Sequence, residues 1–337
     1  MSDNKIHLSS SPHFTEDLST QKIMFAVIFS MIPECIAGIY FFGIPALIRI
    51  LAAVASCVAF EAMFQVITKD KIRISNLSAV VSGILLALVI PSTTPLWMVI
   101  LGSLIAMVVA KGLFGGIGSN VFNPALTGRA FMFISFPAAM GACWFNPQTD
   151  AISGATILSQ LKNGSVTATS DLYLQYFLGN RAGCIGETSI LLILISFAFL
   201  ALTRIIDWRA PLAMVATAAF MTFVTGGDVL LALLTGGLLF GATFMVTDYA
   251  TTPVTGWGRV VFGFGCGLIT FLIRKIGGYP EGVMFSILIM NCLTPFLNNI
   301  TRRMYGYGKK GSRRPKSPNR IQEFDISTAK EHKEETK

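Results

Sequence analysis

The sequence contains about ten long apolar runs separated by short polar segments. A helix needs roughly 20 apolar residues to cross the ~30 Å hydrocarbon core of a bilayer. The runs approach that length, although the third and fifth are short or interrupted: 22–42, 46–67, 77–90, 95–112, 125–142, 188–206, 210–226, 229–247, 258–275 and 281–300. Only 13% of the residues are charged, whereas soluble domains carry about 25%. We therefore predict an all-α integral membrane protein with about ten transmembrane helices.

The runs form two sets of five on either side of a polar loop, residues 143–187. Three stretches of the first set resemble stretches of the second: Val81–Leu86 and Thr235–Phe240, Ser92–Pro95 and Ala250–Pro253, Asn123–Thr127 and Asn291–Pro295. Five is an odd number, so two consecutive copies must have opposite orientations in the membrane, as in many transporters. The pattern predicts two five-helix inverted repeats. Chance similarity between apolar runs is the alternative.

Basic residues near the ends of the runs orient the chain, because cytoplasmic loops are enriched in Lys and Arg. The larger group falls on one side: Lys69, Lys71, Arg73, Lys111, Arg129, Arg204, Arg209, Arg259, Arg302 and Arg303. The smaller group falls on the other side: Lys162, Arg181, Arg274 and Lys275. We predict that both termini are cytoplasmic and that the loop is extracytoplasmic.

The predicted parts of the chain follow from the runs and this orientation. They are a cytoplasmic N-terminal segment 1–21, a first membrane half 22–142, the extracytoplasmic loop 143–187, a second membrane half 188–300 and a cytoplasmic tail 301–337. The tail is basic and then mixed in charge, and it supplies much of the net charge of +8. That charge therefore indicates membrane orientation and not a nucleic-acid partner.

The cysteines and histidines give no metal or haem motif. The six cysteines include no C-x-x-C pair, so no zinc or cluster motif is visible in this chain. The histidines, His7, His13 and His332, all lie in polar terminal segments. Cys143 and Cys184 flank the loop, and a disulfide between them is an open alternative to two thiols.

The loop contains a stretch of small residues, Ser153-Gly154-Ala155-Thr156. A threonine hydroxyl can be esterified by a phosphate, and the small neighbours leave room for a modifying enzyme and a bulky group. The alternative is structural. Ser153 or Thr156 would then be the N-cap of a short helix that ends near Gly164.

Several motifs, taken in order along the chain, resemble one family of redox-complex subunits. They are His7–His13, Ala37–Gly43, Gly115–Leu126, Val246–Thr255 and Gly277–Val283. In combination they resemble the D subunits of the Rnf complex, an ion-translocating ferredoxin:NAD⁺ oxidoreductase. The resemblance covers residues 7–300 and leaves out the tail. Gly115–Leu126 is also similar to the B subunit of the sodium-pumping NADH:quinone reductase, which is the alternative family. The short N-terminus and the start at His7–His13 favour the Rnf subunit.

This resemblance implies a covalent cofactor in the loop. In the family, FMN is joined through its phosphate to the threonine of this motif, which is Thr156 here. Ser153, Gly154 and Ala155 would be recognised by the attaching enzyme. The subunit would lie in the cell inner membrane and relay electrons between ferredoxin and NAD⁺ through the other complex subunits, including a second flavin-bearing subunit. Electron flow would be coupled to movement of Na⁺ or H⁺.

The glycine-rich segment before the fifth run holds further candidates. Asn123 followed by Pro124 is typical of a helix N-cap, and Asn120 can cap the same turn. The alternative, which the related reductase implies, is a second non-covalent flavin or riboflavin. Its contacts would be Asn120, Asn123 and Asp248.

Two carboxylates lie inside apolar runs, where a charge is costly unless it is paired or hydrated. Glu34 and Glu61 are therefore candidates for a cation path, with contacts to neighbouring subunits as the other interpretation. Arg49 lies about 18 Å from Glu61 along a helix and does not pair with it. Two functions without redox chemistry stay open at this point: a small-solute channel or permease, and a structural scaffold.

Overall fold

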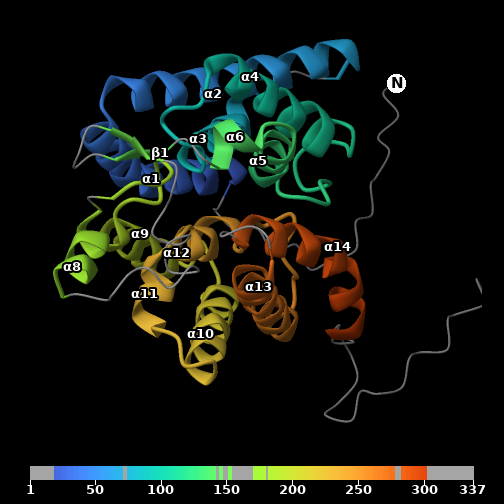
Figure 1. Cartoon of the computed structure of the whole chain (residues 1–337). Coiled ribbons are helices and arrows are strands. Elements are labelled where there is room, and N and C mark those ends of the chain that lie inside the picture. The colour runs from blue at the N-terminus through green and yellow to red at the C-terminus, as the bar shows by residue number, and fades with distance from the viewer. Residues whose placement is uncertain are drawn as a thin grey trace, which may run out of the picture.

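The computed structural model describes residues 19–70, 74–141, 144–146, 151–153, 170–179, 181–277 and 282–301. The chain forms two stacked helical lobes (Figure 1). In that view the lobe built from the first five apolar runs lies above the lobe built from the last five. The loop expected between the two membrane halves joins them in sequence.

The first lobe consists of α1 Thr20–Phe42, α2 Ile44–Ile67, the 3₁₀ turn η1 Ile74–Asn76, α3 Ser78–Leu88, α4 Leu96–Leu104, its π-helical continuation η2 Ile105–Gly112, α5 Pro124–Ser135 and α6 Pro137–Gly141. The connecting part contains β1 Trp144–Asn146, β2 Ala151–Ser153 and α8 Ser170–Leu178. The second lobe consists of α9 Ile190–Leu202, α10 Arg209–Val224, α11 Val229–Leu234, α12 Leu238–Phe240, its π-helical continuation η3 Gly241–Met245, α13 Gly256–Ile276 and α14 Val283–Thr301.

Helix starts follow local capping chemistry. Ser19 accepts a hydrogen bond from the Lys22 N–H at the start of α1. Gly43 separates α1 from α2 with φ 69°, a left-handed conformation that favours glycine. Asn123 accepts from the Leu126 N–H and Pro124 fills the first turn of α5. The capping role expected for Asn123 is therefore confirmed.

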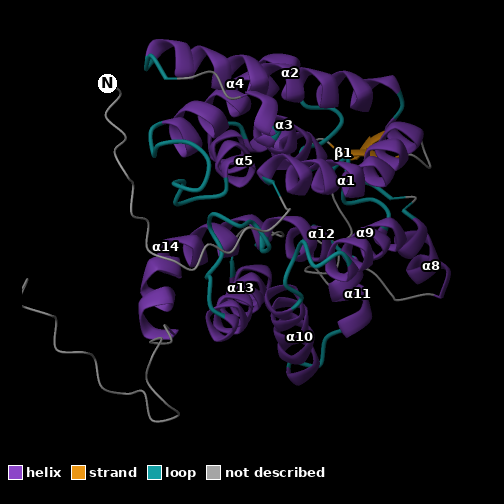
Figure 2. Cartoon of the chain, turned by 180° about the vertical axis from the view of Figure 1, so that it is seen from behind, coloured by secondary structure: helices purple, strands orange, loops and turns teal. Residues whose placement is uncertain are grey.

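Each of the ten apolar runs contains helix, so the prediction of an all-α membrane protein is confirmed. Within the described residues, four helices have the length and composition to cross a bilayer by themselves: α1, α2, α13 and α14. The remaining runs form shorter helices, and the eighth is broken between α11 and α12. The runs and the helices therefore do not correspond one to one. Figure 2 also shows a small hairpin of β1 and β2 among the helices.

Helices of the two lobes pack against each other. Across the lobes, α1 packs against α9 and α5 packs against α14, which are corresponding elements of the two sets. Gly38, near the end of α1, lies against Ile185, which shortly precedes α9. Met24, near the start of α1, and Leu200, near the end of α9, line one cavity. α1 and α9 thus run in opposite directions, as an inverted repeat requires, and the repeat as a whole stays a prediction.

Glycines allow α10 and α13 to approach closely, as small residues do in membrane helix pairs. A Cβ atom on Gly263 would lie 2.2 Å from the Ala210 carbonyl oxygen, and one on Gly267 would lie 2.5 Å from the Met214 carbonyl oxygen. Backbone atoms of a packed helix cannot move aside, so these positions admit no side chain.

We expect Gly263→Ala to destabilise the second lobe by about 1–3 kcal/mol, the usual cost of overpacking. The measurement is the fraction of subunit that stays monodisperse after the solubilised complex is heated. The control is Gly265→Ala on the same helix, whose Cβ would meet the flexible end of Met290 at 2.5 Å. Equal heat stability of the two variants would show that the close approach is not needed.

Candidate functional site

In the loop between the two membrane halves, the structure describes residues 144–146 and 151–153, up to Ser153 of the motif, and then again 170–179 and 181–187. β1 pairs with β2 antiparallel, and Ser153 is the register partner of Trp144. Gly154, Ala155 and Thr156, together with a helix expected after Ser153, lie outside the described residues. The covalent site therefore stays a prediction. Cys143 also lies outside, so its disulfide with Cys184 is untested.

The chain that returns from the loop is fixed to both lobes. The Gly186 N–H donates to the Leu88 carbonyl at 2.7 Å and the Ile185 N–H donates to the Ile90 carbonyl at 3.1 Å. These bonds satisfy carbonyls at the end of α3, which would otherwise lack partners. In the second lobe, the Tyr173 hydroxyl donates to the Asp228 carboxylate at the start of α11. The loop is therefore held at both the first and the second lobe.

A buried ion pair lies beside this returning segment. Arg129 Nη1 on α5 is 3.7 Å from Glu187 Oε1, and both side chains are buried. Arg129 Nη2 also donates to Cys184 Sγ at 3.5 Å. The charge pattern treats Arg129 as a solvated loop residue, whereas its side chain is buried and reaches the segment that precedes α9.

Two arginines of the smaller basic group donate hydrogen bonds to carbonyls at the end of α11, where the eighth run is broken. Arg274 donates to the Ala232 carbonyl at 2.7 Å and to the Thr235 carbonyl at 3.1 Å. Arg181 donates to the Leu234 carbonyl. The end of α11 has carbonyls without helical partners and a negative dipole end, and both favour cations. The presence of these arginines on the expected extracytoplasmic side thus has a structural cause.

A cavity of about 350 Å³ between the lobes brings together Asn120, Asn123 and Asp248, as expected. The volume falls within the range of small-molecule sites. Lys111 and Ser78 also line it. Each expected residue has a local bond as well. Asn120 donates to the Phe122 carbonyl at 3.1 Å, and Asp248 accepts from Thr251 Oγ1 at 3.0 Å.

Glu61 has a partner that the sequence pattern did not reveal. Lys111 Nζ, fifty positions further along the chain, donates to Glu61 Oε1 at 2.7 Å. It lies 2.6 Å from Ser78 Oγ, at the start of α3. The two charged side chains are 5% and 8% exposed, so this is a buried ion pair. The sequence offers one sign of this pairing, a lysine near the end of the fourth run. The charge pattern assigns that lysine to a loop and so hides it as a partner of Glu61.

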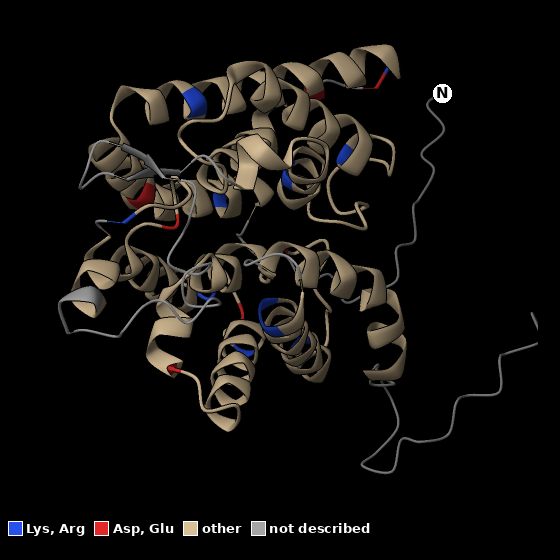
Figure 3. Cartoon of the chain, viewed as in Figure 1, with Lys and Arg blue, Asp and Glu red and all other residues tan. Residues whose placement is uncertain are grey.

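Glu34 lies at the contact between the lobes. Ser196 Oγ on α9 is 2.7 Å from Glu34 Oε1 and 2.7 Å from the Ser30 carbonyl. Glu34 is 2% exposed. Glu34 and Glu61 are both buried inside the fold, which argues against contacts with neighbouring subunits as the reason for their presence. Figure 3 shows how few charged residues interrupt the helices.

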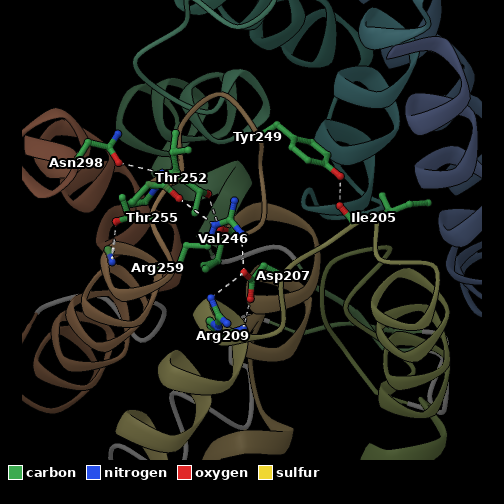
Figure 4. A network of polar contacts seen from close by, with 12 residues as sticks. Ile205, Asp207, Arg209, Val246, Tyr249, Thr252, Thr255, Arg259 and Asn298 are labelled. Atoms are coloured by element: carbon green, nitrogen blue, oxygen red, sulfur yellow. Dashed lines mark hydrogen bonds and ion pairs between the residues drawn. The ribbon is translucent and has the colours of Figure 1, made fainter. Parts of the chain in front are cut away.

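A polar network fixes the loop that carries Asp248 (Figure 4). Arg259 Nη1 pairs with Asp207 Oδ2 at 2.6 Å, and Arg259 Nε donates to the Pro253 carbonyl at 3.0 Å. Partial burial by itself would raise the pKa of Asp207. Hydrogen bonds from the Arg209 N–H and Arg259, together with both guanidinium charges, outweigh it and hold that pKa below its usual value.

Tyr249 anchors the other side of this loop, because its hydroxyl donates to the Ile205 carbonyl (Figure 4). Thr252 Oγ1 donates to the Val246 carbonyl at 2.6 Å, which satisfies an acceptor at the end of η3. Asp248 therefore sits on a loop that is tied down at both ends, at one end of the helix bundle.

Comparisons with known proteins agree with this architecture. A family model described as the NQR2, RnfD, RnfE family matches residues 7–306. The D subunit of the Na⁺-translocating ferredoxin:NAD⁺ oxidoreductase complex of Acetobacterium woodii is 42% identical, over 92% of this chain and 98% of the relative. The proton-translocating counterpart of Clostridium ljungdahlii is 38% identical, over 92% and 98%.

A more distant relative extends the match beyond these organisms. The D subunit of the ion-translocating oxidoreductase complex of an Escherichia coli strain is 33% identical, over 90% of this chain and 99% of the relative. Near-complete coverage on both sides means that the relatives share the two lobes and the loop between them. The chain belongs to the NQR2, RnfD, RnfE family.

Proposed function

We propose that the chain is the D-type membrane subunit of an Rnf-type complex, which relays electrons between ferredoxin and NAD⁺ and couples that flow to movement of Na⁺ or H⁺. The observation that carries the proposal is the near full-length similarity to relatives that bear this name. Their names differ in the ion, so the choice between Na⁺ and H⁺ is not part of the proposal. The ferredoxin and NAD⁺ chemistry belongs to the partner subunits.

Within that function, Thr156 carries FMN through a phosphoester, and Ser153, Gly154 and Ala155 form the recognition site for attachment. A bound flavin supplies one- and two-electron redox chemistry, while the protein supplies position and electrostatics. The intact motif supports this assignment.

The orientation is part of the same proposal: both termini are cytoplasmic and the flavin loop is extracytoplasmic, in the cell inner membrane. Thr20, at the start of α1, and Asp70, beyond α2, line one cavity, so Lys69 lies at that end of the bundle. α9 packs against α1, and its last turn lies near the start of α1. Arg204, which follows α9, therefore lies at the same end of the bundle as Lys69. Grouped basic residues support a cytoplasmic assignment for it.

The interlobe cavity is the best place for a second, non-covalent flavin or riboflavin. Asn120, Asn123 and Asp248 line it from both lobes, and amide and carboxylate groups can hydrogen-bond a flavin ring. The capping bonds of Asn123 leave its Nδ2 atom available for such a contact.

Flavin fluorescence of the subunit in a denaturing gel tests the redox assignment. The intact complex is expressed with its flavin-attaching enzyme, and the subunit band is expected to fluoresce. A dark band, from cells in which a known substrate of the enzyme is labelled, would leave the fold in place and remove the redox role. That result would favour the channel or scaffold function instead.

Glu34→Gln and Glu61→Gln test the cation path. We expect each change to lower the number of ions moved per electron at least tenfold, because a neutral amide oxygen does not neutralise the charge of a cation at membrane depth as a carboxylate does. The measurement is ion uptake into proteoliposomes together with the rate of electron transfer. An unchanged ratio in both variants would exclude these carboxylates from the path.

A further inference from the structure

The Lys111–Glu61 pair stands between two cavities. One is the interlobe cavity described above, which Lys111 lines together with Asp248. The other, here called the outer cavity, has a volume of about 680 Å³ and is lined by Thr20, Glu61, Asp70, Asn76, Lys111 and Gly116. Lys111 is thus common to both cavities, and Glu61 faces only the outer one. Both charged groups are buried, so the pair forms part of the wall between the cavities.

The Glu61 carboxylate has one oxygen that accepts no hydrogen bond from the described residues. Oε1 accepts from Lys111, whereas the buried Oε2 has no hydrogen-bond partner within the described residues. An unsatisfied carboxylate oxygen in a buried position is costly. The carboxylate therefore has a vacant ligand position next to the ammonium group that now neutralises it.

Lys111 has a second carboxylate within reach of its charge. Asp248 lines the interlobe cavity together with Lys111, so its carboxylate faces the same space as the ammonium group. A lysine is a compact charge on a flexible four-carbon stem. Its Nζ can therefore leave Glu61 for the Asp248 side while its backbone stays within η2.

We infer that Glu61 forms a monovalent-cation site in the outer cavity, and that the Lys111 ammonium fills it when no ion is present. An entering ion takes the place of the ammonium at Glu61. The ammonium then turns toward Asp248 and opens the wall between the cavities. This inference rests on the proposed cation path and adds the residue that competes with the ion.

The main test removes the competitor. Lys111→Met leaves the Glu61 charge buried without its partner, which strongly destabilises a fold unless another cation compensates. The heat stability of the variant complex is expected to rise by several degrees with increasing Na⁺, Li⁺ or K⁺, and not with choline, whose methyl groups keep its charged nitrogen from direct coordination by the carboxylate oxygens. The wild-type complex should gain less from the same ions, because Lys111 already occupies the position.

Two control variants define the site. Lys111→Met/Glu61→Gln has the same shape without either charge, so its stability should not depend on the ion. Arg129→Met breaks another buried pair, Arg129–Glu187, which lines neither cavity. It should be destabilised without rescue by small cations. A Lys111→Met variant that is equally unstable in every ion would overturn the inference.

A second measurement needs no variant. In the wild-type complex, reductive methylation of Lys111, read from peptide masses, is expected to speed up severalfold when a small cation releases the ammonium. Lys69, an exposed lysine at the same end of the bundle, is the internal control and should not change. Equal methylation of Lys111 with and without the ion would contradict the inference. Neither readout involves the flavin, so failure here and failure at Thr156 can be told apart.

Discussion

Replacement of Thr156 by valine is expected to abolish the flavin fluorescence of the subunit completely. Valine has nearly the shape of threonine but no hydroxyl, so no phosphoester can form. The measurement is in-gel fluorescence under denaturing conditions, which retains only covalent flavin. Electron transfer through the complex should fall to background in the same preparation, because a relay with a missing carrier has no alternative short route.

The controls for this prediction come from the same loop. Thr167→Val removes a hydroxyl outside the motif, and the variant is expected to fluoresce like the wild type. Thr156→Ser keeps a hydroxyl and is expected to retain part of the signal. Full fluorescence in Thr156→Val, or its loss in Thr167→Val, would place the flavin on another residue.

Arg129→Met is expected to destabilise the subunit by about 3–5 kcal/mol, which is the usual cost of leaving a buried charge without its partner. The change removes the Arg129 charge from beside the Glu187 carboxylate, which is 7% exposed and lies where the chain enters the second lobe. Most of the loss should appear as separation of the loop's return segment from α5. Heat-induced aggregation of the solubilised complex measures it.

A double variant separates charge from packing in this prediction. Arg129→Met/Glu187→Gln removes both charges, and it should recover part of the stability, because a neutral pair leaves no stranded ion. If Arg129→Met alone were as stable as the wild type, the pair would contribute nothing and the bonds of Gly186 and Ile185 would suffice to hold the segment.

The helices were predictable because burial in lipid requires a long run of apolar residues, which is a local signal. The Asn123 cap was predictable for a similar reason, since Asn-Pro at a helix start acts within one turn. These features depend on residues that are close together in the sequence.

The pairings inside the bundle could not be predicted in this way. Glu61 and Lys111 lie fifty positions apart, and only the packing of α2 against η2 brings them together. Charge counting placed Arg129 at a membrane surface because it treats every basic residue as solvated. The fold buries this arginine against Glu187 instead.

The break between α11 and α12 has a consequence for biogenesis. Its carbonyls receive donors from Arg181, which is synthesised earlier, and from Arg274, which is synthesised about forty residues later. Until α13 leaves the ribosome, Ala232 and Thr235 lack these partners, and unsatisfied carbonyls are not tolerated in lipid. α11 therefore cannot be released into the bilayer as a finished element when it is made. We expect the insertion machinery to hold it until α13 arrives, so that the second lobe is completed as a group and not helix by helix.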